Sequence, residues 1–424
     1  MTILTTLNNT KPMKNQNIQS LGIAVAMLAL SGSVASAQFS VLHSFAGGAD
    51  GANPYYGAPV VSGSTLYGTT DLGTGGGGTV FSVNTDGTGF NVVHSFSSTA
   101  PDGYGPLGSV VLSGSTLYGT TYYGGRAGGS SGNGTIFAVN TDGTGYQTVY
   151  SFATTAGYKP YGTVTVSGST LYGMTYYSIG GLGSIYSFNT ASSSYTTLHN
   201  FVGGASDGSR PLGGSLTLIG SSLYGLTAHG GTGSSSSTDG TAFTIYTAGT
   251  GYNNLVNFTG GSVGANPYGS LTQVGAKLYG MTRVGGNAND GTIFSVNTDG
   301  SGFSTLYSFT GGATGGANPN GSLTLDGSIL VGTTKAGGNA NDGTVFEINL
   351  DGSGFSILHN FTGLDGANPD GDLTLANNTL YGWTSSGGAN NDGTVFALQV
   401  PEPSICALGV SGFGLLLMFR RRKP

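Results

Sequence analysis

Short apolar segments separated by glycine-rich turns recur along most of this chain. Seven segments alternate apolar and polar residues and end in phenylalanine, as in Leu-His-Ser-Phe at 42–45, and their phenylalanines are spaced 49 to 57 residues apart. Alternation with a period of two is typical of β-strands. The chain is therefore predicted to be a tandem repeat of β structure. The phenylalanines are Phe45, Phe96, Phe152, Phe201, Phe258, Phe309 and Phe361.

Two further markers recur in step with these segments. The tripeptide Leu-Tyr-Gly begins at Leu66, Leu117, Leu171, Leu223, Leu278 and Leu380, with Leu330-Val331-Gly332 as a variant copy. The motif Gly-Thr-x-Phe, or a close relative, begins at Gly78, Gly134, Gly183, Gly240, Gly291, Gly343 and Gly393. Since three separate markers each occur seven times, the chain holds seven copies of one unit.

Each copy is predicted to contain four strands, here called a to d. In the copy at 321–361 the strands are expected at 322–325, 328–334, 343–349 and 355–361. Asp326-Gly327 would form a type I′ hairpin turn between a and b, and 351–354 would turn the chain from c into d. Four short strands in each of seven repeats predict an all-β, seven-bladed propeller with four-stranded antiparallel blades.

The chain enters this ring in the middle of a blade. It opens with a d strand at 39–45 and ends with a c strand at 393–400. Pairing of these two strands would complete the seventh blade and remove two exposed sheet edges. An open β-solenoid is the alternative architecture.

The N-terminus has the organisation of a secretory signal peptide. Lys11 and Lys14 precede an apolar run at 21–30, and Ala35-Ser36-Ala37 offers a cleavage site for signal peptidase. Residues 1–37 are therefore assigned to a signal peptide and 38–400 to the propeller. A short membrane anchor is the alternative, but the apolar run is shorter than a bilayer span.

Residues 401–424 carry a second address. Pro401-Glu402-Pro403 is followed by an apolar stretch at 405–419 and a basic end at 420–423. This segment resembles the PEP-CTERM sorting signal of Gram-negative bacteria. The resemblance implies processing by an exosortase, transient membrane insertion of the C-terminal segment, and delivery to the cell envelope, cell surface or extracellular matrix. An ordinary tail anchor is the alternative.

The repeat itself also resembles a known family. Leu-Tyr-Gly, a Gly-Gly loop, Gly-Thr-x-Phe and an Asp-Gly-x-Gly turn together resemble the GloVer tandem repeat over nearly all of 38–400. The resemblance implies a surface-exposed repeat protein and supplies no reaction or catalytic residues. Kelch propellers are a more distant likeness, because kelch units usually carry one tryptophan each and this chain has a single Trp383.

Charge and cysteine content limit the possible partners. Residues 38–400 include 17 acidic and six basic side chains, so no basic face is expected that would bind nucleic acid. Cys406, in the C-terminal apolar stretch, is the sole cysteine, so no intramolecular disulfide can form.

One loop position varies from copy to copy within the constant frame. It lies three residues after the glycine of Leu-Tyr-Gly and reads Asp71, Tyr122, Tyr176, Ala228, Arg283, Lys335 and Ser385. A constant frame that presents different side chains at equivalent places is typical of a tailored binding rim; drift on a solvated loop would give the same variation. The predicted ligand-binding rim comprises Asp71, Tyr122, Tyr176, His229, Arg283, Lys335 and Trp383, with Tyr123 and Tyr177 beside it.

Other groups of polar residues offer less. The histidines His43, His94, His199 and His359 share one position on strand d, so a ring would place them on separate blades, too far apart to bind one metal. Asn-rich loops at 287–290 and 339–342 could hold a calcium ion, and no other cofactor is expected. No Ser-His-Asp, Cys-His or paired-carboxylate signature was recognised.

These observations predict a non-enzymatic, exported surface or matrix protein that acts as a binding scaffold for exopolysaccharide or another surface protein. Two alternatives remain open. One is a lectin with one site per blade, which would gain affinity from multivalency. The other is an enzyme acting across the central channel, which would lose turnover when Arg283, Lys335 or Asp71 is replaced.

Overall fold

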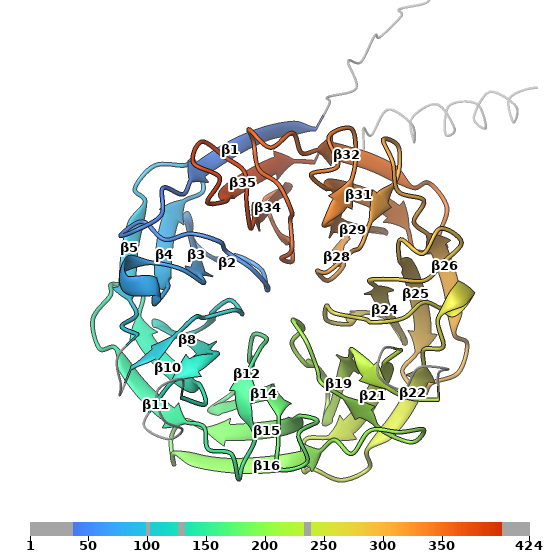
Figure 1. The fold of residues 1–424 in the computed structure, drawn as a ribbon, viewed down its shortest axis with the longest axis horizontal. Helices are drawn as coiled ribbons and strands as arrows, with labels where there is room; N and C mark the ends of the chain where they lie inside the picture. The colour runs from blue at the N-terminus through green and yellow to red at the C-terminus, as the bar shows by residue number, and fades with distance from the viewer. Residues whose placement is uncertain (1–36, 99–101, 126–131, 233–238, 401–424) are drawn as a thin grey trace, which may run out of the picture. The chain divides into compact units, whose positions relative to one another are not determined.

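The chain folds into a ring of seven four-stranded antiparallel β-sheets (Figure 1). The computed structural model describes residues 37–98, 102–125, 132–232 and 239–400. The predicted seven-bladed propeller is confirmed. The proposed signal peptide, apart from its last residue, and the motif Pro401-Glu402-Pro403 lie outside the described residues.

The blades have strands of closely similar length. Blade 1 comprises β2 (Val60–Ser62), β3 (Thr65–Thr70), β4 (Thr79–Asn84) and β5 (Asn91–Ser95). Blade 2 comprises β7 (Val111–Ser113), β8 (Thr116–Thr121), β10 (Thr135–Asn140) and β11 (Gln147–Ser151). Blade 3 comprises β13 (Thr165–Ser167), β14 (Thr170–Tyr177), β15 (Ser184–Asn189) and β16 (Ser194–Asn200). Blades 4 and 5 comprise β18 (Thr217–Ile219), β19 (Ser222–Thr227), β21 (Thr241–Tyr246) and β22 (Asn253–Asn257); and β23 (Thr272–Val274), β24 (Lys277–Thr282), β25 (Thr292–Asn297) and β26 (Ser304–Ser308).

The ring continues with the same order of strands. Blade 6 comprises β28 (Thr324–Asp326), β29 (Ile329–Thr334), β31 (Thr344–Asn349) and β32 (Ser356–Asn360), and blade 7 comprises β33 (Thr374–Ala376), β34 (Thr379–Thr384), β35 (Thr394–Gln399) and β1 (Gln38–Ser44). In the described loops the chain forms the 3₁₀ turns η1 (Thr74–Gly76) and η3 (Gly261–Val263). Among the described residues there is no helix with the length and apolarity needed to cross a membrane.

The turn between strands a and b differs from its prediction by one residue. Asp326 pairs with Ile329, so the central residues are Gly327 and Ser328 rather than Asp326 and Gly327. Gly327 has φ +59° and Ser328 has no positive φ, the pattern of a type II′ turn with glycine first. The predicted type I′ turn was therefore wrong here. In blade 7 both central residues, Asn377 and Asn378, have positive φ, as a type I′ turn requires.

The hydrophobic core lies between neighbouring blades. In one such interface Phe96 from blade 1 meets Phe137 from blade 2 edge to face, with ring centroids 5.0 Å apart, and Leu117 is fully buried beside them. Burial of each such side chain contributes about 2–3 kcal/mol. Because every blade hides its apolar faces against two neighbours, the recurrence of Phe and Leu in the sequence follows from the stacking of blades.

The N-terminal strand closes the ring, as predicted. β1 pairs antiparallel with β35, and the amide of Phe45 donates to the carbonyl of Gly393 at 3.0 Å. Phe39 stacks on His359 with ring centroids 3.7 Å apart. This contact reproduces the stack of Phe90 on His43, also 3.7 Å apart, between blades 7 and 1. The seventh blade is therefore held by the same interblade contacts as the others.

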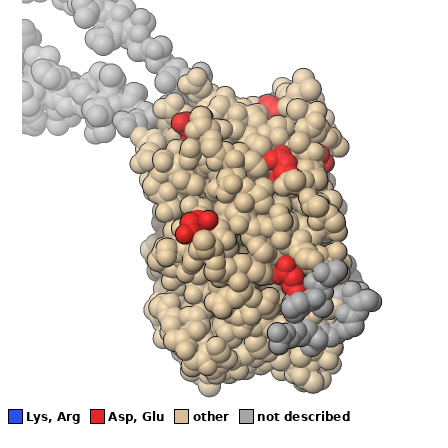
Figure 2. All heavy atoms as spheres, turned by 90° about the vertical axis from the view of Figure 1, so that its left-hand side faces the viewer, with Lys and Arg blue, Asp and Glu red and all other residues tan. Residues whose placement is uncertain are grey.

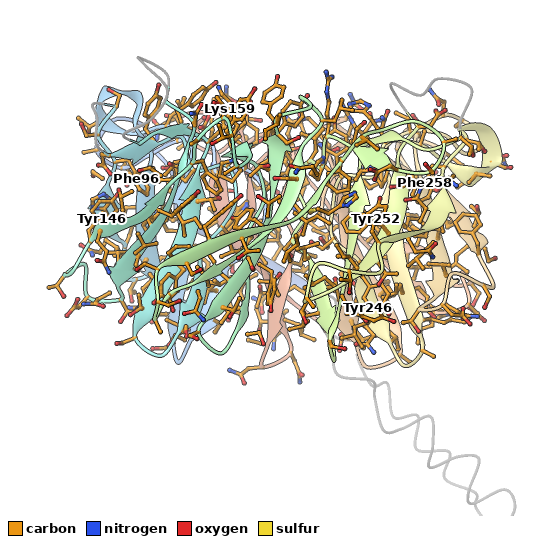
Figure 3. The ribbon with its side chains drawn as sticks, turned by 90° about the horizontal axis from the view of Figure 1, so that it is seen from below. Phe96, Tyr146, Lys159, Tyr246, Tyr252 and Phe258 are labelled. Carbon is orange, nitrogen blue, oxygen red and sulfur yellow. The ribbon has the colours of Figure 1, made fainter. Side chains whose placement is uncertain are left out.

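The loops from d to a and from b to c emerge on one side of the ring, here called the loop face, and the hairpin turns emerge on the other, the turn face. Figure 3 shows Lys159 at the loop face and Tyr246 at the turn face. Short ladders join the two kinds of loop within a blade, so the loop face has its own backbone support. They pair β6 (Gly103–Tyr104) with β9 (Tyr123–Gly124), β12 (Tyr158–Pro160) with β14, β17 (Gly208–Ser209) with β20 (His229–Gly230), and β27 (Gly316–Ala317) with β30 (Ala336–Gly337).

Candidate functional site

Tyrosines from blades 2 and 3 gather on the loop face. Tyr122 and Tyr123 are perpendicular neighbours with ring centroids 4.7 Å apart, and Tyr176 and Tyr177 repeat this arrangement at 4.6 Å. The second ring of each pair is stacked on a tyrosine of the d-to-a loop, at 5.1 Å in both blades. These stacks fix the rings in place, because Tyr104 and Tyr158 belong to the short ladders that join the loops.

Tyr161 joins the two pairs into one surface. Its ring centroid lies 5.5 Å from that of Tyr122 and 5.9 Å from that of Tyr176. It also lies 5.5 Å from Tyr56 of blade 1. Burial raises the pKa of Tyr161 to about 12, so its phenol is neutral at physiological pH. We call Tyr56, Tyr122, Tyr123, Tyr161, Tyr176 and Tyr177 the tyrosine platform.

Two cations lie over the rings of this platform. The Nζ atom of Lys159 is 4.6 Å from the ring centroid of Tyr122 and 4.3 Å from that of Tyr123. The Cζ atom of Arg210 lies 5.8 Å from the ring centroid of Tyr176. Such cation–π contacts contribute about 0.5–2 kcal/mol. Each cation comes from the blade that follows its tyrosine, so the contacts cross the interfaces between blades.

The remaining rim cations have different surroundings. The Nη1 atom of Arg283 donates a hydrogen bond of 3.3 Å to the hydroxyl of Tyr268. Lys335 forms an ion pair of 3.1 Å with the fully buried side chain of Asp370. The charge of Lys335 is therefore neutralised inside the protein, whereas Arg283 has a neutral partner.

Asp71 and His229 lie at the two ends of the platform. Asp71 Oδ1 and the ring of Tyr123 each lie 3.2 Å from the position that a Cβ atom on Gly105 would take. Burial raises the pKa of the Asp71 carboxyl to about 6. His229 lines a cavity of about 270 Å³ together with Arg210 and the backbone of Gly203. Six of the seven predicted rim residues thus lie on the loop face, at successive blades around the ring.

Trp383 does not belong to the rim, contrary to its prediction. Its side chain is 1% exposed, and the indole N–H donates to the carbonyl of Tyr55 at 2.7 Å. Trp383 is equivalent in strand b of blade 7 to Thr333 in strand b of blade 6. The hydroxyl of Thr333 likewise donates to a carbonyl of the next blade, that of Gly371. The side chain therefore fills the interface between blades 7 and 1 instead of facing solvent.

The axis of the ring is narrowed by residues of strand a and the loop before it. A ring of hydrogen bonds links successive blades, as where the amide of Ser215 donates to Ser270 Oγ at 2.8 Å and that of Ser270 to Ser322 Oγ at 2.7 Å. Asp372 holds the same place in blade 7, accepting from the Ser322 amide at 2.6 Å, and burial raises the pKa of its carboxyl. All seven blades line a cavity of about 430 Å³ at this level.

The other polar candidates make local contacts. His199 Nε2 lies 3.1 Å from Asp207, and His43 and His359 have carboxylate partners at 3.1 Å and 3.0 Å on their own d-to-a loops. Within the described ranges no three His, Cys, Asp or Glu side chains lie close enough together to bind a metal. In the two Asn-rich loops, Asn289 and Asn341 accept backbone hydrogen bonds of 3.0 Å from Gly285 and Gly337. Calcium binding by these loops stays a prediction.

The sequence matches the model of one protein family twice, over residues 30–238 and 214–405, and the family is described as the Gloeobacter/Verrucomicrobia repeat. The chain belongs to this family. The resemblance to the GloVer repeat is confirmed. Among curated proteins none matches the sequence.

Solved structures similar to this member of the repeat family include enzymes. An oligogalacturonate lyase from Vibrio parahaemolyticus matches 87% of this chain and 98% of its own, with a TM-score of 0.53 and 12% identity. An oligogalacturonate lyase in complex with manganese matches 87% of this chain and 97% of its own, with a TM-score of 0.50 and 12% identity. A putative 6-phosphogluconolactonase from Bacteroides fragilis matches 76% of this chain and 89% of its own, with a TM-score of 0.49 and 15% identity.

The comparison with the lyases corrects one expectation. The protein was expected not to be an enzyme because no catalytic signature was recognised in the sequence, yet the matched ring is that of a lyase over 98% of its length. The expectation is therefore contradicted. At 12% identity the likeness concerns the fold, and it transfers no residue, substrate or reaction to this repeat protein.

Lys159 and Arg210 were missed by the sequence reasoning, although a signal for them exists. Each directly precedes the proline that opens a blade, where blades 1, 5, 6 and 7 carry Asn-Pro. Blades 3 and 4 thus carry a cation at a position where four other blades carry asparagine, and this departure is visible in the sequence. Tyr161 directly follows Pro160 and Tyr56 lies two residues after Pro54, and neither was among the predicted rim residues.

Proposed function

We propose that this protein is exported to the envelope or surface of a Gram-negative bacterium and that its tyrosine platform binds polysaccharide. The platform is the observation that carries the proposal. Neutral phenol rings offer apolar faces to the C–H surfaces of sugar rings and hydroxyl groups to their oxygens. The six half-buried tyrosines are linked by ring centroid distances of 4.6 to 5.9 Å and so form one continuous group across blades 1 to 3.

The export part of the proposal rests on the two ends of the sequence. Residues 1–37 have the order of a signal peptide, and 401–424 resemble a PEP-CTERM signal. In this proposal signal peptidase removes the first segment, and an exosortase recognises Pro401-Glu402-Pro403 while the C-terminal segment is inserted in the membrane. A protein delivered in this way meets exopolysaccharide outside the cell.

The distribution of aromatic residues favours one continuous site over a lectin with a site in every blade. A Tyr-Tyr pair directly follows strand b in blade 2 and ends strand b in blade 3, and the residues that correspond to the first tyrosine are Ala228 in blade 4 and Ser385 in blade 7. Since the same position holds an aliphatic or small polar residue there, the blades cannot offer equivalent sugar contacts. The platform covers one sector of the ring.

A glycan array with the purified protein tests the proposal. We expect saturable binding to a subset of polysaccharides, and we expect the double variant Tyr122→Ala/Tyr176→Ala to weaken it about tenfold or more, because each ring face contributes about 1 kcal/mol. Tyr246→Ala is the matched control, since Tyr246 is 52% exposed on the turn face. Equal loss in the control, or no glycan bound by the parent protein, would overturn the proposal.

A further inference from the structure

Three of the described cations on the loop face have no carboxylate partner among the residues that the structure describes. Within the described part of the chain one ion pair involves a lysine or arginine, and it joins Lys335 to Asp370. Lys159, Arg210 and Arg283 instead lie over the rings of tyrosines, at 4.3 to 5.8 Å from the ring centroids. On the wall of the ring shown in Figure 2, carboxylates are visible and no described lysine or arginine is. Two of the three, Lys159 and Arg210, thus lie over rings of the tyrosine platform itself.

Lys159 and Arg210 also hold a backbone conformation that their side chains disfavour. Their φ angles are +58° and +52°, in the left-handed region. That conformation costs roughly 1–2 kcal/mol for residues other than glycine, and less for asparagine. The equivalent residue is Gly105 in blade 2 and asparagine in blades 1, 5, 6 and 7, namely Asn53, Asn266, Asn318 and Asn368.

The asparagines at this position have a structural role that the cations do not take over. Asn266 Nδ2 donates to the carbonyl of Ala228 at 2.8 Å, and Asn318 Nδ2 donates to that of Arg283 at 3.2 Å. Lys159 and Arg210 make no such bond to any described residue and extend over the platform instead. Local turn chemistry therefore does not explain their presence. Unfavourable backbone conformations that persist in a fold are frequent at functional sites.

We infer that the tyrosine platform is specific for acidic glycans, with Lys159 and Arg210 as the residues that bind their anionic groups. This inference rests on the proposed function. A chain of sugars lying on Tyr122, Tyr161 and Tyr176 would pass Lys159 at Tyr122 and Arg210 at Tyr176. A guanidinium binds a carboxylate or sulfate through two parallel hydrogen bonds, and an ammonium binds it as a point charge.

The test is a calorimetric titration of the intact protein with two matched pairs of probes. Alginate oligosaccharides are compared with the same oligosaccharides after reduction of their carboxyl groups, and dextran sulfate is compared with dextran. Within each pair the charge differs and the sugar backbone is retained. The two charged members distinguish carboxylate from sulfate as the group that is bound.

The variants are Lys159→Asn and Arg210→Asn, which place in blades 3 and 4 the residue that four other blades carry. Because asparagine tolerates this φ, both variants are expected to fold. The matched control is Lys277→Asn, which removes an exposed cation of the turn face. We expect at least one charged probe to bind tenfold or more tightly than its neutral partner, each variant to lose about tenfold, and the control to lose nothing.

Each other outcome overturns a defined part of the account. Equal affinity for charged and neutral probes, or full affinity in both variants, would overturn the acidic specificity while the tyrosine platform remains a saccharide site. Equal loss in Lys277→Asn would assign the effect to net charge and would also overturn it. If no saccharide binds in either pair or on the array, the proposed function fails together with this inference.

Discussion

Tyr56 of blade 1 packs against Gly213 of blade 4. A Cβ atom on Gly213 would lie 3.1 Å from the ring of Tyr56 and 3.0 Å from the carbonyl oxygen of Tyr268. Both residues are insertions, since blades 1 and 4 have one more residue than the others between the proline and the start of strand a. The two insertions thus meet at the centre of the loop face, where Tyr56 joins the tyrosine platform.

We expect Gly213→Ala to lower the free energy of unfolding by about 2–4 kcal/mol, because alanine is strained at φ +70° and its methyl group would displace Tyr56. Gly181→Ala is the matched control: Gly181 has φ +77° and nothing within 4 Å of a Cβ position. It should cost only the roughly 1–2 kcal/mol of backbone strain. Chemical denaturation measures both. Equal costs in the two variants would contradict the packing of Tyr56 on Gly213.

The closure of the ring predicts a large effect at the N-terminal strand. Phe39→Ala removes the stack on His359 and the contact with Phe396, whose ring centroid is 5.5 Å away. We expect a loss of about 2–3 kcal/mol in the free energy of unfolding. Val41→Ala, in the same strand, is 40% exposed and should change it by less than about 1 kcal/mol. A ring that tolerates Phe39→Ala as well as Val41→Ala would not depend on this closure.

Much of this architecture could be predicted from the sequence, because the contacts between blades are made by the residues that recur. Phe96 and Leu117 mark the repeat and also fill the core. The a-to-b turn was placed one residue early, since Asp-Gly and Gly-Ser both suit a tight turn and the pairing of Asp326 with Ile329 decides between them.

The candidate site was less accessible to prediction. Trp383 was assigned to the rim, but side chains alternate along strand b and its position faces the next blade. The contact of Tyr56 with Gly213 joins loops of blades 1 and 4, and no sequence pattern places these loops together. Lys159 and Arg210 stand out only when their position is compared with Asn-Pro in the other blades and the positive φ is known.

Lys159→Asn and Arg210→Asn should stabilise the fold. Each removes a residue that is disfavoured at positive φ and introduces one that can donate to a neighbouring carbonyl, as Asn266 does. Each variant also loses a cation–π contact worth about 0.5–2 kcal/mol. Relief of about 1–2 kcal/mol of backbone strain and a new hydrogen bond of about 1 kcal/mol outweigh that loss, so we expect the free energy of unfolding to rise by about 1 kcal/mol. The converse change, Asn318→Lys, should lower it by a similar amount. Thermal unfolding of the three variants tests this prediction. If Lys159→Asn and Arg210→Asn were destabilising, the claim that Lys159 and Arg210 are strained at positive φ would be refuted.

Asp71 predicts a pH dependence of stability. Burial raises the pKa of its carboxyl to about 6 in the folded protein, above the value near 4 of an unfolded chain. Its ionisation therefore opposes folding: stability is lost as pH rises from about 4 to about 6, by up to about 3 kcal/mol, and is regained on acidification. Asp71→Asn should match the parent protein at pH 4 and be more stable than it at pH 7.5.

Asp86 is the control for Asp71, with the opposite sign. It is exposed, and hydrogen bonds from the side chain and amide of Thr88 lower the pKa of its carboxyl. Its contribution is therefore present near neutral pH and lost as the pH falls through the folded pKa. Asp86→Asn should be less stable than the parent at pH 7.5 and equal to it at low pH. Parallel pH profiles for Asp71→Asn and Asp86→Asn would contradict the burial of Asp71.

The central claim, that the tyrosine platform is the saccharide-binding surface, is tested most directly by NMR of ring-labelled tyrosines during titration with alginate oligosaccharides. Substitution of single tyrosines by phenylalanine assigns the signals. We predict that the signals of Tyr122, Tyr123 and Tyr176 shift with one saturation curve while that of Tyr246, on the turn face (Figure 3), stays unchanged. Saturable binding that shifts Tyr246 and leaves the platform signals in place would contradict the account.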